Sequence, residues 1–364
     1  MPRVVIAAGG TAGHVVPALA VADALRDSGA EVSFLGTLEG PEARLVPDAG
    51  YPIDYLRARG IDRASPLKAL AAGGLAVTAT AKARSAIRAR GADAVMGGGG
   101  YVAGPAGLAA LSRRVPLVLT EADRHLGLAN RLLAARARRV CLAFPIPGRD
   151  GDRYLVTGRP VPSAIVTADR DAARDRFGIP AGDRCLLVFG GSQGARSINL
   201  CALEAFVGDA LAARDRGYHV LHIAGHRDYP LARELVDGAG GAESYTLLEY
   251  EPNLAEALAA SDLVLARAGG SVFELAAAGR PAILVPYPHA TARHQHANAA
   301  WMADAGAAVV IEDEALDPAA LVRAVAEILN DEDRLTAMAS ASRSLARPDA
   351  AQRIADEILS AARG

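Results

Sequence analysis

Short apolar runs alternate with longer amphipathic segments along the whole chain. The runs cover residues 4–8, 32–35, 94–96, 117–119, 140–143 and 154–156 in the first half, and residues 185–189, 219–224, 245–248, 263–266, 282–285 and 308–311 in the second. Runs of this length that are apolar throughout are typical of strands buried on both faces, and the segments between them are typical of helices. The pattern predicts an α/β protein whose parallel sheets carry helices on both sides.

The alternation is interrupted once, at residues 157–162, which contain two prolines and a glycine. Because proline disfavours both helix and central strand, we place a linker there, between domains at residues 1–160 and 161–345. A last helix is expected at 350–362, after Arg347-Pro348, and is predicted to pack back on the first domain. Two doubly wound, Rossmann-like domains would bind a ligand in a central cleft between them.

Each half opens with a strand, a glycine-rich bend and a helix. The bends are Gly9-Gly10-Thr11-Ala12-Gly13-His14 and Gly190-Gly191-Ser192-Gln193-Gly194-Ala195. Glycines at a helix N-terminus allow backbone N–H groups to face an anion. The first bend has neither the G-x-G-x-x-G spacing of a dinucleotide site nor the Lys-Ser/Thr of a P-loop. The bends therefore predict another phosphate-bearing or sugar-bearing ligand.

Composition narrows the functional classes. The net charge of −2 gives no global attraction to nucleic acid, so no nucleic-acid partner is expected. Three scattered cysteines do not form a disulfide framework or a metal knuckle, which fits a reducing cytoplasm. No stretch offers eighteen uninterrupted apolar residues and no signal peptide is recognised, so we expect a soluble protein, or one peripheral to a membrane.

The motifs together resemble the MurG family of peptidoglycan N-acetylglucosaminyltransferases. The resemblance rests on both glycine bends and on three further stretches, namely residues 97–105, Glu274-Leu275-Ala276-Ala277-Ala278-Gly279 and His294-Gln295-His296-Ala297-Asn298-Ala299. It implies a two-domain GT-B fold and a cofactor-free enzyme that moves GlcNAc from UDP-GlcNAc to the C4 hydroxyl of MurNAc in undecaprenyl-linked lipid I. The product would be lipid II, formed with inversion at the cytoplasmic face of the membrane, with other cell-wall enzymes as possible partners.

Inversion in one displacement requires a base on the attacking hydroxyl. His14 is the candidate, because histidine titrates near neutral pH and this one lies just past the first bend. The alternative is a histidine in the first turn of a helix that binds a phosphate or a backbone group.

The other candidate site residues are expected to bind substrate. Ser192 would meet the diphosphate, although a tight turn capped by serine is the alternative, and Gln193 beside it is also expected to bind substrate. Glu274 would take the ribose hydroxyls, or merely compensate a helix dipole. Gln295 and Asn298 lie three apart on one helical face and would bind sugar hydroxyls. The set is completed by Thr11, Ala12, Gly13 and Gly270. No metal is expected, because the neighbouring histidines lack carboxylates at ligand spacing.

Two candidates stand where the sequence departs from the family pattern. The family usually has His-Glu-Gln-Asn where this chain has Thr120-Glu121-Ala122-Asp123, so Asp123 can accept hydrogen bonds from sugar hydroxyls but lacks the amide donor. The family's Asn-Pro-Val-Arg corresponds here to Arg159-Pro160-Val161-Pro162. The diphosphate arginine is therefore missing from its place, and Arg159 is the candidate to replace it.

A basic segment without acids spans residues 63–92, and apolar side chains are interleaved with its charges. Such a surface can lie on anionic lipid beside the lipid tail of an acceptor. The alternative is a solvated helix whose leucines pack inward. The basic residues are Arg63, Lys68, Lys82, Arg84, Arg88 and Arg90, and the apolar ones Leu67, Leu70, Leu75, Val77 and Ile87.

Three rival functions remain open at the level of sequence. A transferase of the same fold could act on another glycolipid or on a secondary metabolite. A UDP-GlcNAc 2-epimerase also uses two such domains but releases UDP-ManNAc without an acceptor. A non-catalytic nucleotide-sugar binding protein would not need His14.

Overall fold

The computed structural model describes the chain except residues 59–65, 192, 208–216, 240–243 and 291–292, and the side chains of residues 66–74 are also outside the description. The chain divides into two compact units. Unit 1 comprises Met1–Pro162 and Arg347–Gly364, and unit 2 comprises Ser163–Ala346.

Unit 1 is built on a sheet of parallel strands in the order β3-β2-β1-β4-β5-β6-β7. The strands are β1 (Arg3–Ala7), β2 (Glu31–Gly36), β3 (Ile53–Tyr55), β4 (Ala94–Gly97), β5 (Leu117–Glu121), β6 (Arg139–Leu142) and β7 (Tyr154–Val156). The helices are α1 (Ala12–Asp27), α2 (Glu42–Asp48), α3 (Pro66–Ala89), α4 (Ala103–Ser112), α5 (Leu128–Leu133) and α16 (Ala350–Arg363), with a 3-10 turn at Ala134–Arg136.

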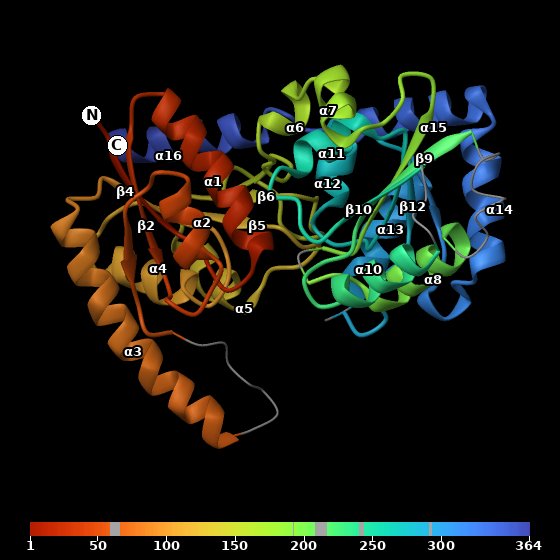
Figure 1. The fold of residues 1–364 in the computed structure, drawn as a ribbon. Coiled ribbons are helices and arrows are strands. Elements are labelled where there is room, and N and C mark those ends of the chain that lie inside the picture. Colours follow the sequence, from red (N-terminus) through yellow and green to blue (C-terminus); the bar gives the residue numbers. More distant parts are fainter. Residues whose placement is uncertain (59–65, 192, 208–216, 240–243, 291–292) are drawn as a thin grey trace. The chain divides into compact units, whose positions relative to one another are not determined.

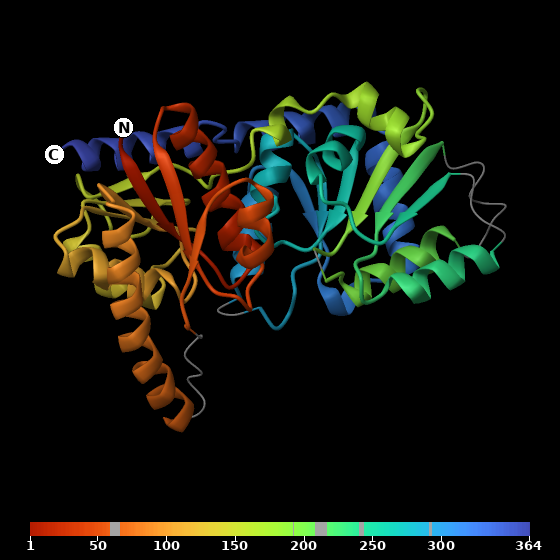
Figure 2. The same cartoon turned by 60° about the vertical axis from the view of Figure 1, so that its left-hand side comes forward.

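Side chains of successive strand residues enter two different cores of unit 1, because a strand alternates its faces. Val4 and Ile6 of β1 pack with α1, α2 and α16, whereas Val5 and Ala7 pack with α3, α4 and α5. The C-terminal helix α16 packs against α1 (Figure 1), and α3 extends well beyond the sheet at its N-terminal end (Figure 2). Both faces of the sheet are thus covered, which explains why the central strands β1 and β4 are apolar after Arg3.

Unit 2 has the same construction, with parallel strands in the order β10-β9-β8-β11-β12-β13. The strands are β8 (Arg184–Phe189), β9 (Tyr218–Ile223), β10 (Tyr245–Leu248), β11 (Leu263–Ala266), β12 (Ala282–Leu284) and β13 (Ala308–Val310). The helices are α6 (Ala164–Thr167), α7 (Arg170–Phe177), α8 (Arg196–Phe206), α10 (Tyr229–Gly238), α11 (Leu254–Ala260), α12 (Val272–Ala278), α13 (His294–Asp304), α14 (Pro318–Leu329) and α15 (Glu332–Ser344), with a 3-10 turn at Asp313–Ala315.

The strand order reverses direction at one point in each sheet. In unit 1 this point lies between β1 and β4, and in unit 2 between β8 and β11. Loops after two such neighbouring strands leave the sheet in opposite directions, which opens a crevice at its carboxyl edge. Both glycine bends follow the first strand of these pairs, so the chain places them where α/β proteins bind ligands. The predicted α/β class with parallel, doubly wound sheets is confirmed.

Candidate functional site

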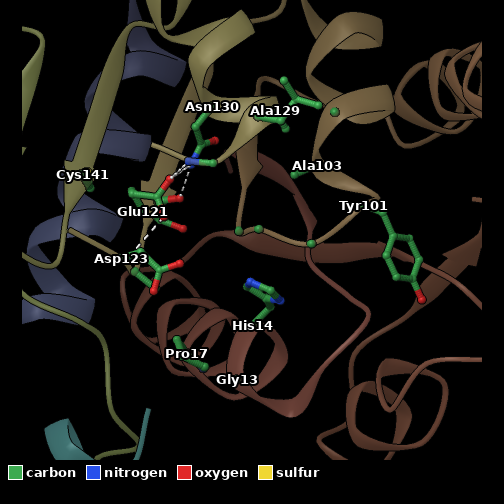
Figure 3. Close-up of a pocket in the computed structure, with 18 of the residues that line it drawn as sticks. Gly13, His14, Pro17, Tyr101, Ala103, Glu121, Asp123, Ala129, Asn130 and Cys141 are labelled. Atoms are coloured by element: carbon green, nitrogen blue, oxygen red, sulfur yellow. Dashed lines mark hydrogen bonds between the residues drawn. The ribbon is translucent and has the colours of Figure 1, made fainter. Parts of the chain in front are cut away.

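A pocket of about 430 Å³ opens at the reversal point of unit 1 (Figure 3). Residues from the loops after β4 and β5 line it, and so do helices α1, α4 and α5. Of the candidates named from the sequence, Gly13, His14, Asp123 and Arg159 lie in its wall. Thr11 and Ala12 adjoin it at the start of α1. The structure therefore brings together residues that are up to 146 positions apart.

His14 occupies the first turn of α1, with its imidazole directed into the pocket beside the carboxylate of Asp123 (Figure 3). The start of the helix is fixed by Thr11, whose backbone is extended and whose carbonyl accepts from the N–H groups of His14 and Val15. The Thr11 side chain does not cap the helix. Its hydroxyl instead lies 3.1 Å from Nδ1 of His14. The bend thus orients the imidazole through a side chain of its own.

The glycine run after β4 packs directly against the first bend. Gly99 has a φ of +101°, and a Cβ added there would lie 2.5 Å from Cδ2 of His14. A Cβ on Gly100, whose φ is +74°, would overlap the carbonyl of Gly9. Glycine is required at both positions because of backbone conformation and close approach together. The backbone of the loop after β4 therefore lies against the imidazole of His14.

Arg159 donates a hydrogen bond to a helix carbonyl that a proline leaves without its usual N–H partner. Pro17 lies inside α1 and has no N–H to donate to the carbonyl of Gly13, four residues earlier. The Nη2 of Arg159 donates to that carbonyl at 2.5 Å. The proposed replacement of the diphosphate arginine stays a prediction, whereas the observed contact holds residue 159 to the helix that carries His14.

The pKa of His14 lies below its ordinary value. Burial is the main cause, since it disfavours the charged imidazolium, and the positive charge of Arg159 acts in the same direction. Asp123, the backbone of Gly9 and Glu42 oppose this shift. At neutral pH the imidazole is therefore neutral, which is the form that can accept a proton.

Glu121 organises the loop that carries Asp123, and the sequence reasoning missed it. Its buried carboxylate at the end of β5 accepts from the backbone N–H groups of Asp123 and Gly127 and from the side-chain amide of Asn130, at 3.2, 2.8 and 2.9 Å. Figure 3 shows Asn130 and Asp123 on either side of it. An acidic residue that ends an apolar strand was the available signal.

In unit 2 the remaining candidates lie near the carboxyl ends of β8 and β11. Gln193 is exposed on the bend after β8, and Ser192 lies outside the described residues. Glu274 stands in the first turn of α12, and Gly270 precedes that helix. Because β8 and β11 are neighbours, these positions share one edge of the sheet.

Gln295 and Asn298 both lie on α13 but make different contacts. The side-chain oxygen of Gln295 accepts from the backbone N–H of Tyr287 at 2.9 Å. Asn298 is buried, and its amide donates to the carbonyls of Ala268 and Gly269 at 3.1 and 3.4 Å. Asn298 thereby holds the loop that leads to Gly270. Its expected contact with sugar hydroxyls stays a prediction.

The described residues form neither a metal site nor a membrane-spanning helix. Within the described part of the chain, no three His, Cys, Asp or Glu side chains come together as a metal site. Among the same residues, no helix is both long and apolar enough to cross a bilayer.

Only some side chains of the basic segment at residues 63–92 are exposed. Lys82, Arg84, Arg88 and Val77 are exposed, whereas Ile87 is a core residue and does not belong to the expected basic and apolar surface. Arg63 and the side chains of Leu67, Lys68 and Leu70 lie outside the described residues.

Comparisons with known proteins agree with this architecture. Residues 4–142 match the model of the glycosyltransferase family 28 N-terminal domain, and residues 185–354 match that of the C-terminal domain. The UDP-N-acetylglucosamine–N-acetylmuramyl-(pentapeptide) pyrophosphoryl-undecaprenol N-acetylglucosamine transferase of Moorella thermoacetica is 41% identical, over 98% of each chain.

Two solved structures separate the family from a rival that shares its fold. The MurG of Acinetobacter baumannii is 32% identical with a TM-score of 0.75, over 99% of this chain and 100% of that one. A UDP-GlcNAc 2-epimerase from Neisseria meningitidis has a TM-score of 0.69 over 99% and 100% of the two chains, but at 15% identity it shows the fold alone. The chain therefore belongs to glycosyltransferase family 28, and within it to the MurG family of N-acetylglucosaminyltransferases with the GT-B fold.

Proposed function

We propose that the protein transfers GlcNAc from UDP-GlcNAc to the C4 hydroxyl of MurNAc in lipid I, giving lipid II for peptidoglycan synthesis. Its membership of the MurG family and the pocket at the reversal point of unit 1 support this reaction. The domains at residues 1–160 and 161–345 would serve the acceptor and the donor, respectively. Unit 1 supplies the base, and unit 2 supplies the groups for the nucleotide sugar.

The observation that carries the proposal is the place of His14 in the wall of a pocket, where burial lowers the pKa of its imidazole. Nδ1 would donate to the hydroxyl of Thr11, which leaves Nε2 to take the proton of the attacking C4 hydroxyl. As the oxygen attacks the anomeric carbon, the bond to the diphosphate breaks and UDP leaves. Asp123 would accept from sugar hydroxyls and face the positive charge that forms on His14.

Unit 2 would hold the donor at the carboxyl ends of the neighbouring strands β8 and β11. Ser192 and Gln193 would meet the diphosphate at the start of α8, where the helix dipole favours negative charge. Glu274 would accept the ribose hydroxyls, and Gln295 would contact the sugar. Gly270 would allow the backbone to approach the nucleotide closely.

The reaction is tested by incubating the protein with UDP-GlcNAc, with and without lipid I, followed by mass analysis of the products. We expect lipid II and UDP only when lipid I is present. UDP-ManNAc formed without an acceptor would instead identify an epimerase, and no turnover of any kind would identify a binding protein. His14→Ala is expected to lower turnover at least roughly a hundredfold, and near-normal turnover would remove His14 as the base.

A peripheral position at the cytoplasmic face of the membrane is part of the same proposal. Exposed leucines flank the pocket on α4 and α5, namely Leu108, Leu128 and Leu132, and the exposed cations of α3 lie on the helix that packs against α4. An apolar rim with nearby cations suits an acceptor whose lipid tail stays in an anionic membrane. Other cell-wall enzymes remain possible partners.

The membrane proposal predicts a charge-dependent affinity for lipid. Arg84→Glu with Arg88→Glu should abolish co-sedimentation with vesicles that contain anionic lipid. Reversal of two exposed arginines of unit 2, Arg233→Glu with Arg323→Glu, is the matched control and should leave binding unchanged. Equal binding by both double variants would contradict this docking surface.

A further inference from the structure

Glu42, the first residue of α2, is fully buried beneath the first glycine bend. Its Oε1 accepts from the backbone N–H and the hydroxyl of Thr37, at 2.9 and 2.7 Å. Its Oε2 accepts from the backbone N–H of Gly10 at 3.0 Å. One carboxylate therefore ties together the loops that follow two neighbouring strands, β1 and β2.

Three glycines make the space that this carboxylate occupies. A Cβ at Gly9, Gly36 or Gly40 would overlap the side chain of Glu42. Gly36 ends β2 and Gly40 lies in the loop after it, and neither glycine lines the pocket. Their common effect is to admit one acidic side chain to the interior of the unit.

A buried carboxylate is costly unless its charge is compensated. None of the ion pairs formed among the described residues includes Glu42, so its compensation comes from N–H and O–H donors. A glutamine of similar shape would avoid the charge but would turn its N–H₂ group toward one of these donors. The site therefore suits a carboxylate, and its negative charge lies beneath the first bend.

The position of Glu42 changes what the first bend can bind. We expected the bend to direct its N–H groups at an anion, but the N–H of Gly10 already binds a carboxylate. With a negative charge beneath it, the bend is better suited to a neighbouring positive charge. The imidazolium that forms on His14 when it takes a proton is such a charge.

Three charged groups act on His14 from the elements around it. Arg159 lies on the segment after β7, Asp123 on the loop after β5, and Glu42 on α2. The uncharged contacts are the hydroxyl of Thr11 and the backbone of Gly9. Two of the three charges also hold the backbone before His14: Arg159 binds the carbonyl of Gly13, and Glu42 binds the N–H of Gly10.

We propose that Glu42 is a positioning residue: it fixes the Gly9–Gly10 bend so that His14 faces the acceptor hydroxyl, and it supplies negative charge to the imidazolium. The inference rests on the proposed role of His14 as the base. Glu42 touches neither substrate, and its effect passes through His14.

The test compares Glu42→Gln with Thr37→Val in the full-length protein. Glu42→Gln keeps the shape but removes the charge and one acceptor, whereas Thr37→Val removes a donor to the same carboxylate and keeps its charge. Glu42→Gln should lower kcat at least roughly tenfold, leave the KM for UDP-GlcNAc within about twofold, and move the acid limb of the kcat/KM profile to lower pH. Thr37→Val should lower Tm but keep the acid limb in place.

Glu42→Asp decides the matter if the glutamine variant does not fold. It keeps the charge on a shorter side chain, so kcat should fall while the acid limb stays at the wild-type pH. Wild-type kcat in Glu42→Gln or Glu42→Asp overturns the proposal, and so does a shift of the acid limb in Thr37→Val equal to that in Glu42→Gln. Because His14→Ala is assayed alongside, normal turnover in that variant would instead remove the underlying role of His14.

Discussion

The hydroxyl of Thr11 and the Nδ1 of His14 lie 3.1 Å apart within the first turn of α1. Threonine at a helix N-cap ordinarily bonds to the backbone of the same turn. Here the hydroxyl contacts the imidazole instead, so the first turn lacks a side-chain cap and the histidine is held in one orientation. That exchange is the kind of local cost expected at a functional site.

Removal of this hydroxyl should lower activity without unfolding the protein. Thr11→Val leaves Nδ1 without its partner, so the tautomer that exposes a basic Nε2 is no longer favoured. We expect kcat to fall roughly tenfold or more, measured with lipid I and UDP-GlcNAc. Thr11→Ser keeps the hydroxyl and should retain most of the activity, and equal losses in the two variants would contradict this role.

Replacement of Arg159 should move the pH profile upward. The guanidinium lowers the pKa of His14, so Arg159→Met should raise that pKa. Because only the neutral imidazole accepts a proton, the acid limb of kcat/KM should then move to higher pH, opposite to the shift expected for Glu42→Gln. The profile is measured from pH 5 to 8, and an unmoved limb would show that Arg159 acts only through its contact with Gly13.

A side chain at residue 99 should displace His14. Gly99→Ala introduces a Cβ at a positive φ and against the imidazole, so both stability and kcat should fall. Gly29→Ala is the matched control, because its φ is +81° and nothing lies within 4 Å of the added Cβ. Each substitution should cost about 1–2 kcal/mol of unfolding free energy from the backbone alone. Only Gly99→Ala should reduce turnover, and equal turnover in both would argue against the packing effect.

Loss of the Asn298 amide should weaken donor binding. Asn298→Ala removes the donors to Ala268 and Gly269, and the loop before Gly270 should become less ordered. We expect unfolding free energy to fall by about 1–3 kcal/mol and the KM for UDP-GlcNAc to rise. Ser342→Ala removes another buried donor near the far end of α12 and should affect stability alone. An unchanged KM in Asn298→Ala would contradict the positioning role.

Acid should destabilise unit 2 through His222. This histidine is fully buried between Asn199 and Tyr245, and burial lowers its pKa to about 3. Between that value and its ordinary pKa, the unfolded state binds a proton that the native state does not, so stability falls as pH falls. One such proton corresponds to about 1.4 kcal/mol per pH unit. His222→Gln should flatten the dependence of unfolding free energy on pH, whereas His226→Gln, at an exposed site, should not.

The sequence by itself determined the α/β class, the strands and the places of the glycine bends. These features follow from local periodicity, since a strand buried on both faces must be apolar and a sharp turn into a helix favours glycine. The motifs of the MurG family, which recur in order along the chain, also gave the enzyme class. His14 could be named because it lies just past the first bend, and Asp123 because it stands where the family pattern has an asparagine.

Only the tertiary structure decided which groups surround His14. Glu42 reaches Gly10 because β1 and β2 are neighbours, and Arg159 reaches Gly13 because Pro17 leaves that carbonyl without a donor. No periodicity in the sequence encodes such contacts between distant positions. They depend on strand order and on the absence of side chains at particular glycines, and both are set when the chain packs.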